Sequence, residues 1–184
     1  MRYEIRLAGE GGQGLILAGV ILAEAASADE GTNVAQTQSY GPEARGGTSR
    51  SEVVISDHEI DYPRVVEADL LLAMSQEAYR RFAAELKENG VLLIDSIMVQ
   101  HTGRMPAYRI PITQIAEEAT GGRVAANVVA LGLIVGLTDV VSAGAVEAAL
   151  CAHVPEGTRV ANRKALQAGL KASRGLTPST GNDM

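Results

Sequence analysis

The sequence predicts an α/β fold with three layers, α/β/α, around a mostly parallel but mixed sheet that opens with a Rossmann-like strand, glycine turn and helix. The opening unit is the first observation behind this prediction. Tyr3–Ala8 alternates and then becomes apolar, as a strand entering a core does, and a glycine-rich turn follows it at once. Apolar residues at the three-and-four spacing of a buried helix come next, namely Leu15, Ile16, Ala18, Gly19, Leu22, Ala23 and Ala26.

Composition is the second observation. Only 3% of the residues are aromatic and none is Trp, so the core must consist of Ala, Val, Leu and Ile, which suits helices packed on a parallel sheet. A chain of 184 residues that is 46% hydrophobic can bury one substantial core, and we therefore expect one domain over residues 1–172. Residues 173–184 have the composition of a disordered tail.

Short apolar runs, capping residues and helix breakers predict the remaining elements. Strands are expected at Asn33–Ser39, Ser51–Ser56, Asp69–Ala73, Val91–Asp95 and, at an edge, Arg104–Ile110. The first two of these leave no room for a crossover helix, so they should form an antiparallel hairpin with a long tip. Helices are expected at Gln76–Lys87 after a Ser75 cap and before Asn89-Gly90, from a Thr113 cap to Ala119 before Gly121-Gly122, at Val128–Leu137 headed by Asn127, at Ala143–His153 headed by Ser142, and at Ala161–Ala172.

The turn after the first strand carries a G-x-G-x-x-G pattern at Gly9, Gly11 and Gly14. Such a turn admits positive φ and close approach to the backbone, and the helix start behind it can seat an anion. A dinucleotide site would also need an acid at the end of the second strand, and Asn33–Gln38 contains none; Asp29 and Glu30 belong to the preceding turn. The loop therefore predicts a seat for an anionic ligand or a partner's backbone, with a turn used only for tight packing as the alternative.

A second glycine loop forms the tip of the predicted hairpin. It is longer than a turn requires, which favours a binding role. The predicted partner interface consists of Tyr40, Gly41, Pro42, Glu43, Arg45, Gly46 and Gly47. The guanidinium of Arg45 suits an anion or a carboxylate of a neighbouring chain. The alternative is a Glu43–Arg45 pair on the surface.

Several classes of function are disfavoured. The formal charge is −6 and no basic stripe is present, which argues against nucleic acid. Cys151 is the lone cysteine, so a disulfide or an iron–sulfur cluster within the chain is not expected. The scattered His58, His101 and His153 predict no metal site, and no catalytic set is apparent. Asp95, at a strand end, is the best single acid candidate, with capping of the next turn as an equal alternative.

The amino terminus shows no signal-peptide pattern. The longest apolar run, Val128 to Leu137, is half the length of a membrane span. We expect a cytoplasmic protein that does not enter the membrane.

Five blocks in order resemble the gamma subunit of 2-oxoacid:ferredoxin oxidoreductases, a pyruvate/ketoisovalerate oxidoreductase gamma-type domain. These blocks are Gly9–Gly14, Ser39–Gly47, Ala68–Gln76, Gly90–Asp95 and Asn127–Gly132, and the resemblance extends from Arg2 to Gly169. The residue sequence of Ser39–Gly47, followed by Arg50–Ser56, is similar to that of the 2-oxoglutarate branch of the family. Pyruvate or branched-chain 2-oxoacids rank second as substrates.

The resemblance implies a share in a larger enzyme. Such enzymes decarboxylate a 2-oxoacid on thiamine diphosphate and Mg, pass electrons through 4Fe-4S clusters to ferredoxin, and release an acyl-CoA. The resemblance places these cofactors on other subunits, so none is expected on this chain alone. It implies alpha and beta subunits as partners, delta as a further candidate, and ferredoxin as an indirect one.

The same resemblance implies a structural or assembly role, without activity in isolation and with a homodimer as one state of the isolated chain. Gly9, Gly11, Gly12, Gln13 and Gly14 then become candidates for contact with an anion, CoA or a partner's backbone. Two other readings remain open: a stand-alone NAD- or FAD-binding oxidoreductase of Rossmann type, and a non-enzymatic module that self-associates through its Ala- and Gly-rich helices.

Overall fold

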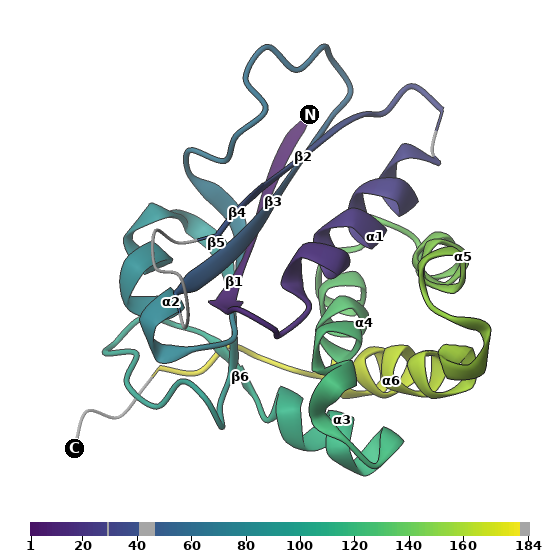
Figure 1. Ribbon diagram of the computed structural model, residues 1–184. Coiled ribbons are helices and arrows are strands. Elements are labelled where there is room, and N and C mark those ends of the chain that lie inside the picture. The colour runs from purple at the N-terminus through teal and green to yellow at the C-terminus, as the bar shows by residue number, and fades with distance from the viewer. Residues whose placement is uncertain (29, 41–46, 181–184) are drawn as a thin grey trace.

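A computed structural model describes residues 1–28, 30–40 and 47–180 of the chain (Figure 1). The strands are β1 Arg2–Glu10, β2 Asn33–Ser39, β3 Thr48–Ser56, β4 Ala68–Ala73, β5 Leu86–Asp95 and β6 Tyr108–Ile110. The α-helices are α1 Leu15–Ser27, α2 Gln76–Phe82, α3 Ile112–Thr120, α4 Ala126–Thr138, α5 Ala143–His153 and α6 Arg159–Ala172. Short 3-10 turns occur at η1 Ala83–Glu85, η2 Arg123–Ala125 and η3 Glu156–Thr158.

The strands form one sheet in the order β2-β3-β1-β4-β5-β6. β4 is parallel to β1, β5 to β4, and β6 to β5, whereas β3 is antiparallel to both of its neighbours. The predicted hairpin of β2 and β3 and the predicted mixed, mostly parallel sheet are both confirmed.

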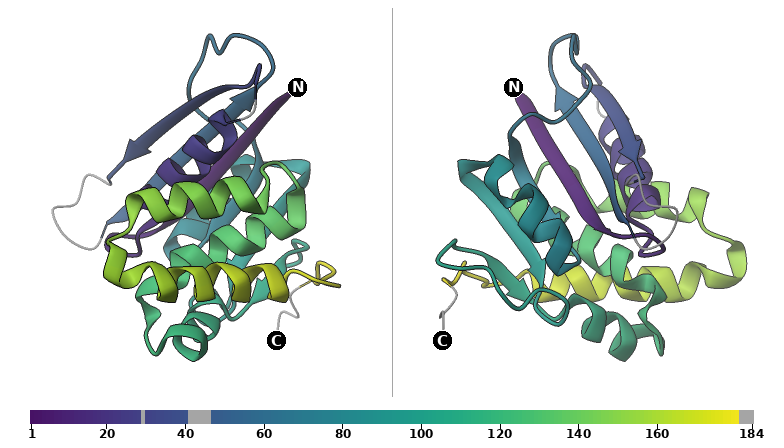
Figure 2. Two further views of the ribbon diagram at one scale, coloured as in Figure 1. Left: turned by 90° about the vertical axis from the view of Figure 1, so that its right-hand side faces the viewer. Right: turned by 60° about the vertical axis from the view of Figure 1, so that its left-hand side comes forward.

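The two faces of the sheet are covered unequally. Because successive strand residues point to opposite faces, Ile5 and Leu7 of β1 face a large apolar core that also contains residues of α1, α3, α4, α5 and α6. Ala8, on the other face, belongs to a smaller cluster with Ala78 and Phe82 of α2. Figure 2 shows most of the helices on one side and α2 on the other, so the third layer is thin.

α4 and α6 approach so closely that their backbones touch. A Cβ added to Gly132 would lie 2.3 Å from the carbonyl oxygen of Leu166, and one added to Gly169 would lie 2.1 Å from that of Val129. The absence of a side chain at these two glycines thus sets the distance between the two helices, and it lets α6 pack directly against α4 (Figure 2).

Two predicted elements had wrong boundaries. The helix expected to reach Lys87 ends at Phe82, because Leu86 pairs with Ala68 and begins β5. In the segment expected to be an edge strand over Arg104–Ile110, only Tyr108–Ile110 pairs with β5. These segments carry little local signal, and pairing with a neighbouring strand decides their conformation.

Two predicted caps have other roles. Pro111 is the N-cap of α3, and Thr113 lies inside its first turn. Asn127 lies inside α4, whose N-cap is Ala125. Ser142 caps α5 as predicted and accepts a hydrogen bond from the amide of Ala145.

The carboxyl-terminal segment was expected to be disordered from residue 173, but part of it is placed against the sheet. Ser179 and Ala107 exchange two backbone hydrogen bonds of 2.9 and 3.0 Å. No described helix has both the length and the apolar character needed to cross a bilayer.

Candidate functional site

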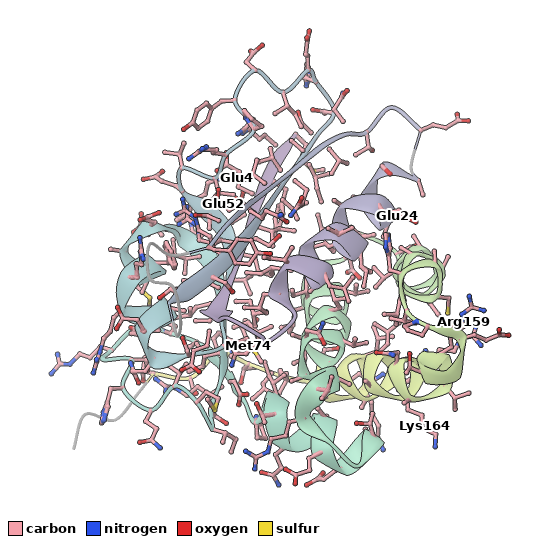
Figure 3. The ribbon with its side chains drawn as sticks, viewed as in Figure 1. Glu4, Glu24, Glu52, Met74, Arg159 and Lys164 are labelled. Carbon is pink, nitrogen blue, oxygen red and sulfur yellow. The ribbon has the colours of Figure 1, made fainter. Side chains whose placement is uncertain are left out.

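A cleft opens where the chain leaves β1 and β4 toward opposite faces of the sheet. α1 follows β1 on the face with the large core, and α2 follows β4 on the other face. Such a divergence leaves a crevice at the carboxyl ends of the strands, where open α/β sheets bind ligands. The cleft here has a volume of about 300 Å³ and is lined by Gly12, Gln13, Met74, Met98, Thr113, Arg123, Val124 and Ala126. Figure 3 labels Met74, directly after β4.

Two glycines of the first loop serve packing inside the chain. A Cβ on Gly9 would lie 2.1 Å from Oε1 of Gln13 and 3.0 Å from Cβ of Met74. Gly14 is the N-cap of α1 with φ 73°, and its carbonyl accepts a 3.0 Å hydrogen bond from Nδ2 of Asn127. These positions require glycine whether or not a ligand binds.

The amide side chain of Gln13 ties the loop to the next strand. Its Oε1 accepts a 2.8 Å hydrogen bond from the amide of Glu10, and its Nε2 donates a 2.9 Å hydrogen bond to the carbonyl of Met74. Both ends of this side chain are therefore used in holding one wall of the cleft.

Gly11 and Gly12 are the open part of the loop. A Cβ at either position would meet no atom within 4 Å of the described chain. Gly12 has φ 92°, a conformation that other residues adopt only with strain, whereas Gly11 does not need positive φ. Within the described residues neither amide N–H makes a hydrogen bond. An incoming acceptor can therefore approach these two amides.

The rest of the cleft is mainly apolar. Met74, Met98 and Val124 form much of its lining, and the side chain of Val124 is 94% exposed. Arg123 is the lining cation and pairs with Glu117 at 3.0 Å on the surface. No carboxylate is among the described lining residues.

The sheet order also argues against a dinucleotide site. In a dinucleotide-binding domain the second strand lies beside the first and supplies the ribose-binding acid. Here the antiparallel β3 separates β2 from β1. The chain therefore departs from a dinucleotide-binding domain in two ways: β2 lacks the ribose-binding acid, and it does not lie beside β1.

Asp95 has the capping role. It is fully buried; its Oδ1 accepts a 3.0 Å bond from the amide of Ile97, while its Oδ2 accepts from both the amide and the hydroxyl of Thr113. The carboxylate therefore joins the end of β5 to the start of α3, and its described partners occupy both oxygens.

The topology places the two ends of the predicted hairpin tip at the edge of the sheet that carries the first glycine loop. Glu10, at the end of β1, pairs with Thr48, at the start of β3, and β2 ends nearby because Ser39 pairs with Arg50. Tyr40 is 69% exposed and Gly47 is half-buried at the two ends of this tip. The other predicted interface residues, Gly41, Pro42, Glu43, Arg45 and Gly46, lie outside the described residues.

Sequence reasoning missed a buried ion network on the thinly covered face. Arg6 is 2% exposed; its Nε donates to Glu52 at 2.9 Å and its Nη1 to Glu85. The available signal was the placement of charged residues at every second position, in Arg2, Glu4 and Arg6 of β1 and in Arg50 and Glu52 of β3. Antiparallel pairing in the observed register then sets Arg6 opposite Glu52.

The histidines remain apart from one another. His58 and His101 are exposed, and Nε2 of His153 lies 2.5 Å from Glu24 Oε2, a contact between α5 and α1 (Figure 3 labels Glu24). Within residues 1–28, 30–40 and 47–180, no three His, Cys, Asp or Glu side chains gather as a metal site would require.

Comparison with known proteins gives the family. The family model described as pyruvate ferredoxin/flavodoxin oxidoreductase matches residues 4–172. The chain is 48% identical over 181 residues to 2-oxoglutarate synthase subunit KorC of Methanocaldococcus jannaschii, and the alignment covers 96% of each. It is 49% identical to the gamma subunit of a keto/oxoacid ferredoxin oxidoreductase from Geobacter sulfurreducens, with a TM-score of 0.85 and coverage of 94% of this chain and 97% of that one.

A larger enzyme contains the same fold. The 2-oxoglutarate:ferredoxin oxidoreductase from Magnetococcus marinus, whose structure has 2-oxoglutarate, coenzyme A and succinyl-CoA bound, matches with a TM-score of 0.82 at 26% identity. The match covers 97% of this chain but 32% of that chain, so the fold forms about a third of a longer polypeptide there. The resemblance to oxidoreductase gamma subunits is confirmed, and the chain belongs to the pyruvate ferredoxin/flavodoxin oxidoreductase family.

Proposed function

We propose that this chain is the gamma subunit of a 2-oxoglutarate:ferredoxin oxidoreductase and that it carries no complete active site of its own. End-to-end similarity to a 2-oxoglutarate synthase subunit is the observation that carries this proposal. The single cysteine of the sequence supports the second part, because a 4Fe-4S cluster needs several thiolate ligands. Pyruvate and branched-chain 2-oxoacids remain the second choice of substrate.

The proposed partners are alpha and beta subunits, with delta as a further candidate and ferredoxin as the indirect electron acceptor. Thiamine diphosphate, Mg, coenzyme A and the 4Fe-4S clusters would be held mainly by those subunits, and the assembly would work in the cytoplasm. The Magnetococcus marinus enzyme supports this arrangement, since it joins the same fold to a longer chain and binds 2-oxoglutarate and coenzyme A.

In this proposal the first glycine loop helps to shape the approach of coenzyme A or of a partner's backbone. The free amides of Gly11 and Gly12 suit an anionic or carbonyl oxygen, and Met74 and Met98, which line the cleft together with Gly12, suit an apolar body. Gly9, Gln13 and Gly14 would hold the loop in shape rather than touch the ligand.

Gly11→Ala tests this role, because it leaves the fold unobstructed and adds a methyl group where an incoming group would pass. The variant is co-expressed with alpha and beta partners and assayed by viologen reduction with 2-oxoglutarate and coenzyme A. We expect normal thermal stability and a loss of turnover or assembly of about tenfold or more. Gly157→Ala is the matched control, since its new methyl group also meets no atom within 4 Å and it lies on η3.

Unchanged turnover and assembly in Gly11→Ala would exclude the loop as a contact site. Omitting the whole chain tests the wider proposal: turnover and assembly without it would contradict a gamma-subunit role. Tight binding of NADH by the isolated chain, followed by fluorescence, would favour a stand-alone oxidoreductase instead. Size measurement of the isolated chain would show whether it forms a homodimer.

A further inference from the structure

Four guanidinium groups on the thinly covered face of the sheet make up what we call the arginine face: Arg6 on β1, Arg50 on β3, Arg64 in the connection after β3, and Arg81 on α2. Arg6, Arg50 and Arg81 surround the ring of Phe82, with their guanidinium carbons 4.9, 5.5 and 5.4 Å from its centroid. Figure 3 labels Glu52, which lies on β3 with Arg50.

Arg6 is neutralised within the chain. Its Nε donates to Glu52 at 2.9 Å, its Nη1 to Glu85, and its Nη2 to the carbonyl of Val65 at 2.9 Å. The second oxygen of Glu52 accepts a 3.4 Å bond from the hydroxyl of Thr37. Both carboxylates of the cluster are thus engaged by the buried arginine.

The other three arginines are not neutralised in this way. Arg50 has Glu52 at 3.7 Å, a carboxylate that Arg6 already binds more closely. The side chains of Arg64 and Arg81 make no hydrogen bond and no ion pair with any described residue, and both residues are exposed. The arginine face therefore keeps an excess of positive charge on a chain whose formal charge is −6.

A small polar recess lies within this face. It has a volume of about 80 Å³ and is lined by Thr37, Gln38, Ser39, Arg50, Glu52 and Arg64. Its size suits one carboxylate-sized group. Arg50 and Arg64 can donate to such a group, because a guanidinium fork matches a carboxylate.

We propose that the arginine face docks an acidic segment of another subunit, with one Asp or Glu carboxylate entering the recess between Arg50 and Arg64. The proposal rests on the proposed function, which requires partner subunits. Charge complementarity selects an acidic occupant. Tyr40, which directly follows the lining residue Ser39 in the sequence, is 69% exposed, and both arginine and tyrosine are enriched in binding hot spots.

Arg64→Glu is the decisive variant. Arg64 is exposed and its side chain has no described partner, so charge reversal there should leave the fold and the thermal midpoint unchanged. The dissociation constant between this chain and the remaining co-purified subunits is measured at several salt concentrations. We expect Arg64→Glu to weaken binding about tenfold or more at low salt and to flatten its salt dependence.

Lys164→Glu is the matched control, since it makes the same change of charge on α6, away from Glu52 in Figure 3. It should alter the dissociation constant less than about twofold. A second experiment uses Arg64→Lys with a carbodiimide, which joins an amine to a carboxylate in direct contact. We expect mass spectrometry of the complex to find the new lysine linked to an Asp or Glu of another subunit.

The outcomes separate the two proposals. If the wild-type chain does not associate with its partners at all, the proposed function fails. If it associates and Arg64→Glu binds equally well, without a cross-link in Arg64→Lys, the docking proposal is overturned and the function stands. Inorganic phosphate is the probe for a small anion: tight phosphate binding that Arg64→Glu abolishes, with assembly unchanged, would also overturn the docking proposal.

Discussion

The two faces of the sheet are stabilised by different interactions, close apolar packing on one and buried ion pairs on the other. On the face of α1 and α4, small residues let the backbone of α4 touch that of α6, and apolar side chains fill the remaining space. On the other face α2 covers only part of the sheet, and the buried Arg6 is held by two carboxylates. The first face is complete within the chain, whereas the second leaves cations without partners and is suited to an interface.

Gly169→Val should have the largest effect on stability, because it disrupts the close packing of α6 against α4. The new side chain would meet the carbonyl of Val129 and the Cα of Gly132, and neither can move aside. We expect a loss of unfolding free energy greater than about 3 kcal/mol by urea denaturation. Gly144→Ala on α5, where a Cβ meets nothing, should be neutral or slightly stabilising; equal losses in both variants would show that close packing is not the cause.

Glu52→Gln should have the next largest effect and tests the charged face. It removes one of the two carboxylates that neutralise buried Arg6, so we expect a loss of about 2–3 kcal/mol, limited because Glu85 remains. Glu117→Gln, in the exposed pair with Arg123, should cost under about 1 kcal/mol. Similar losses in the two variants would mean that burial adds nothing to the Arg6 network.

Arg109→Met should raise stability and so sharpen the contrast between paired and unpaired arginines. Nε and Nη2 of Arg109, on edge strand β6, are buried without any hydrogen-bond partner in the described chain. Removing an unsatisfied buried donor should add about 1 kcal/mol in thermal or urea unfolding. Arg104→Met, at an exposed position in the same segment, should change little; a loss of stability in Arg109→Met would reveal a partner for this guanidinium.

Ionisation of Tyr3 has the smallest expected effect, because it should not change the free energy of unfolding at neutral pH. Burial, followed by the charge of Asp69, raises the pKa of Tyr3 to about 12 from the usual 10. The folded state therefore favours the neutral phenol, and this stabilisation is complete below pH 10 and is lost as the pH rises through 12. Urea unfolding from pH 9 to 12 should show a steeper alkaline decline for the wild type than for Tyr3→Phe; parallel curves would contradict the raised pKa.

The sequence was informative where a local pattern reports its own structure. The apolar runs of β1 and β4, the absence of a crossover helix between β2 and β3 and the Ser142 cap all follow from neighbouring residues. Leu86 and Lys87 were mistaken for the end of a helix because the pairing of Leu86 with Ala68 of β4 is a tertiary effect.

Site residues were harder to assign than elements. All three glycines of the G-x-G-x-x-G pattern were predicted as candidates for contact with a ligand or partner. Gly9 and Gly14 instead pack against Gln13 and Asn127, and of the three only Gly11 faces open space. The partners of a glycine lie far away in the sequence, as Asn127 does from Gly14. For the same reason the contact between Gly132 and Gly169 could not be predicted from the sequence, because it forms only when α4 packs against α6.

β3 has a consequence for how the family can vary. It pairs with β1 without interruption from Arg2↔Ser56 to Glu10↔Thr48. This register sets Glu10, where the first glycine loop begins, opposite Thr48, the first strand residue after the second loop. A single-residue insertion in β3 would turn every following side chain to the opposite face, moving Glu52 away from Arg6. The length of this ladder should therefore stay constant in the family.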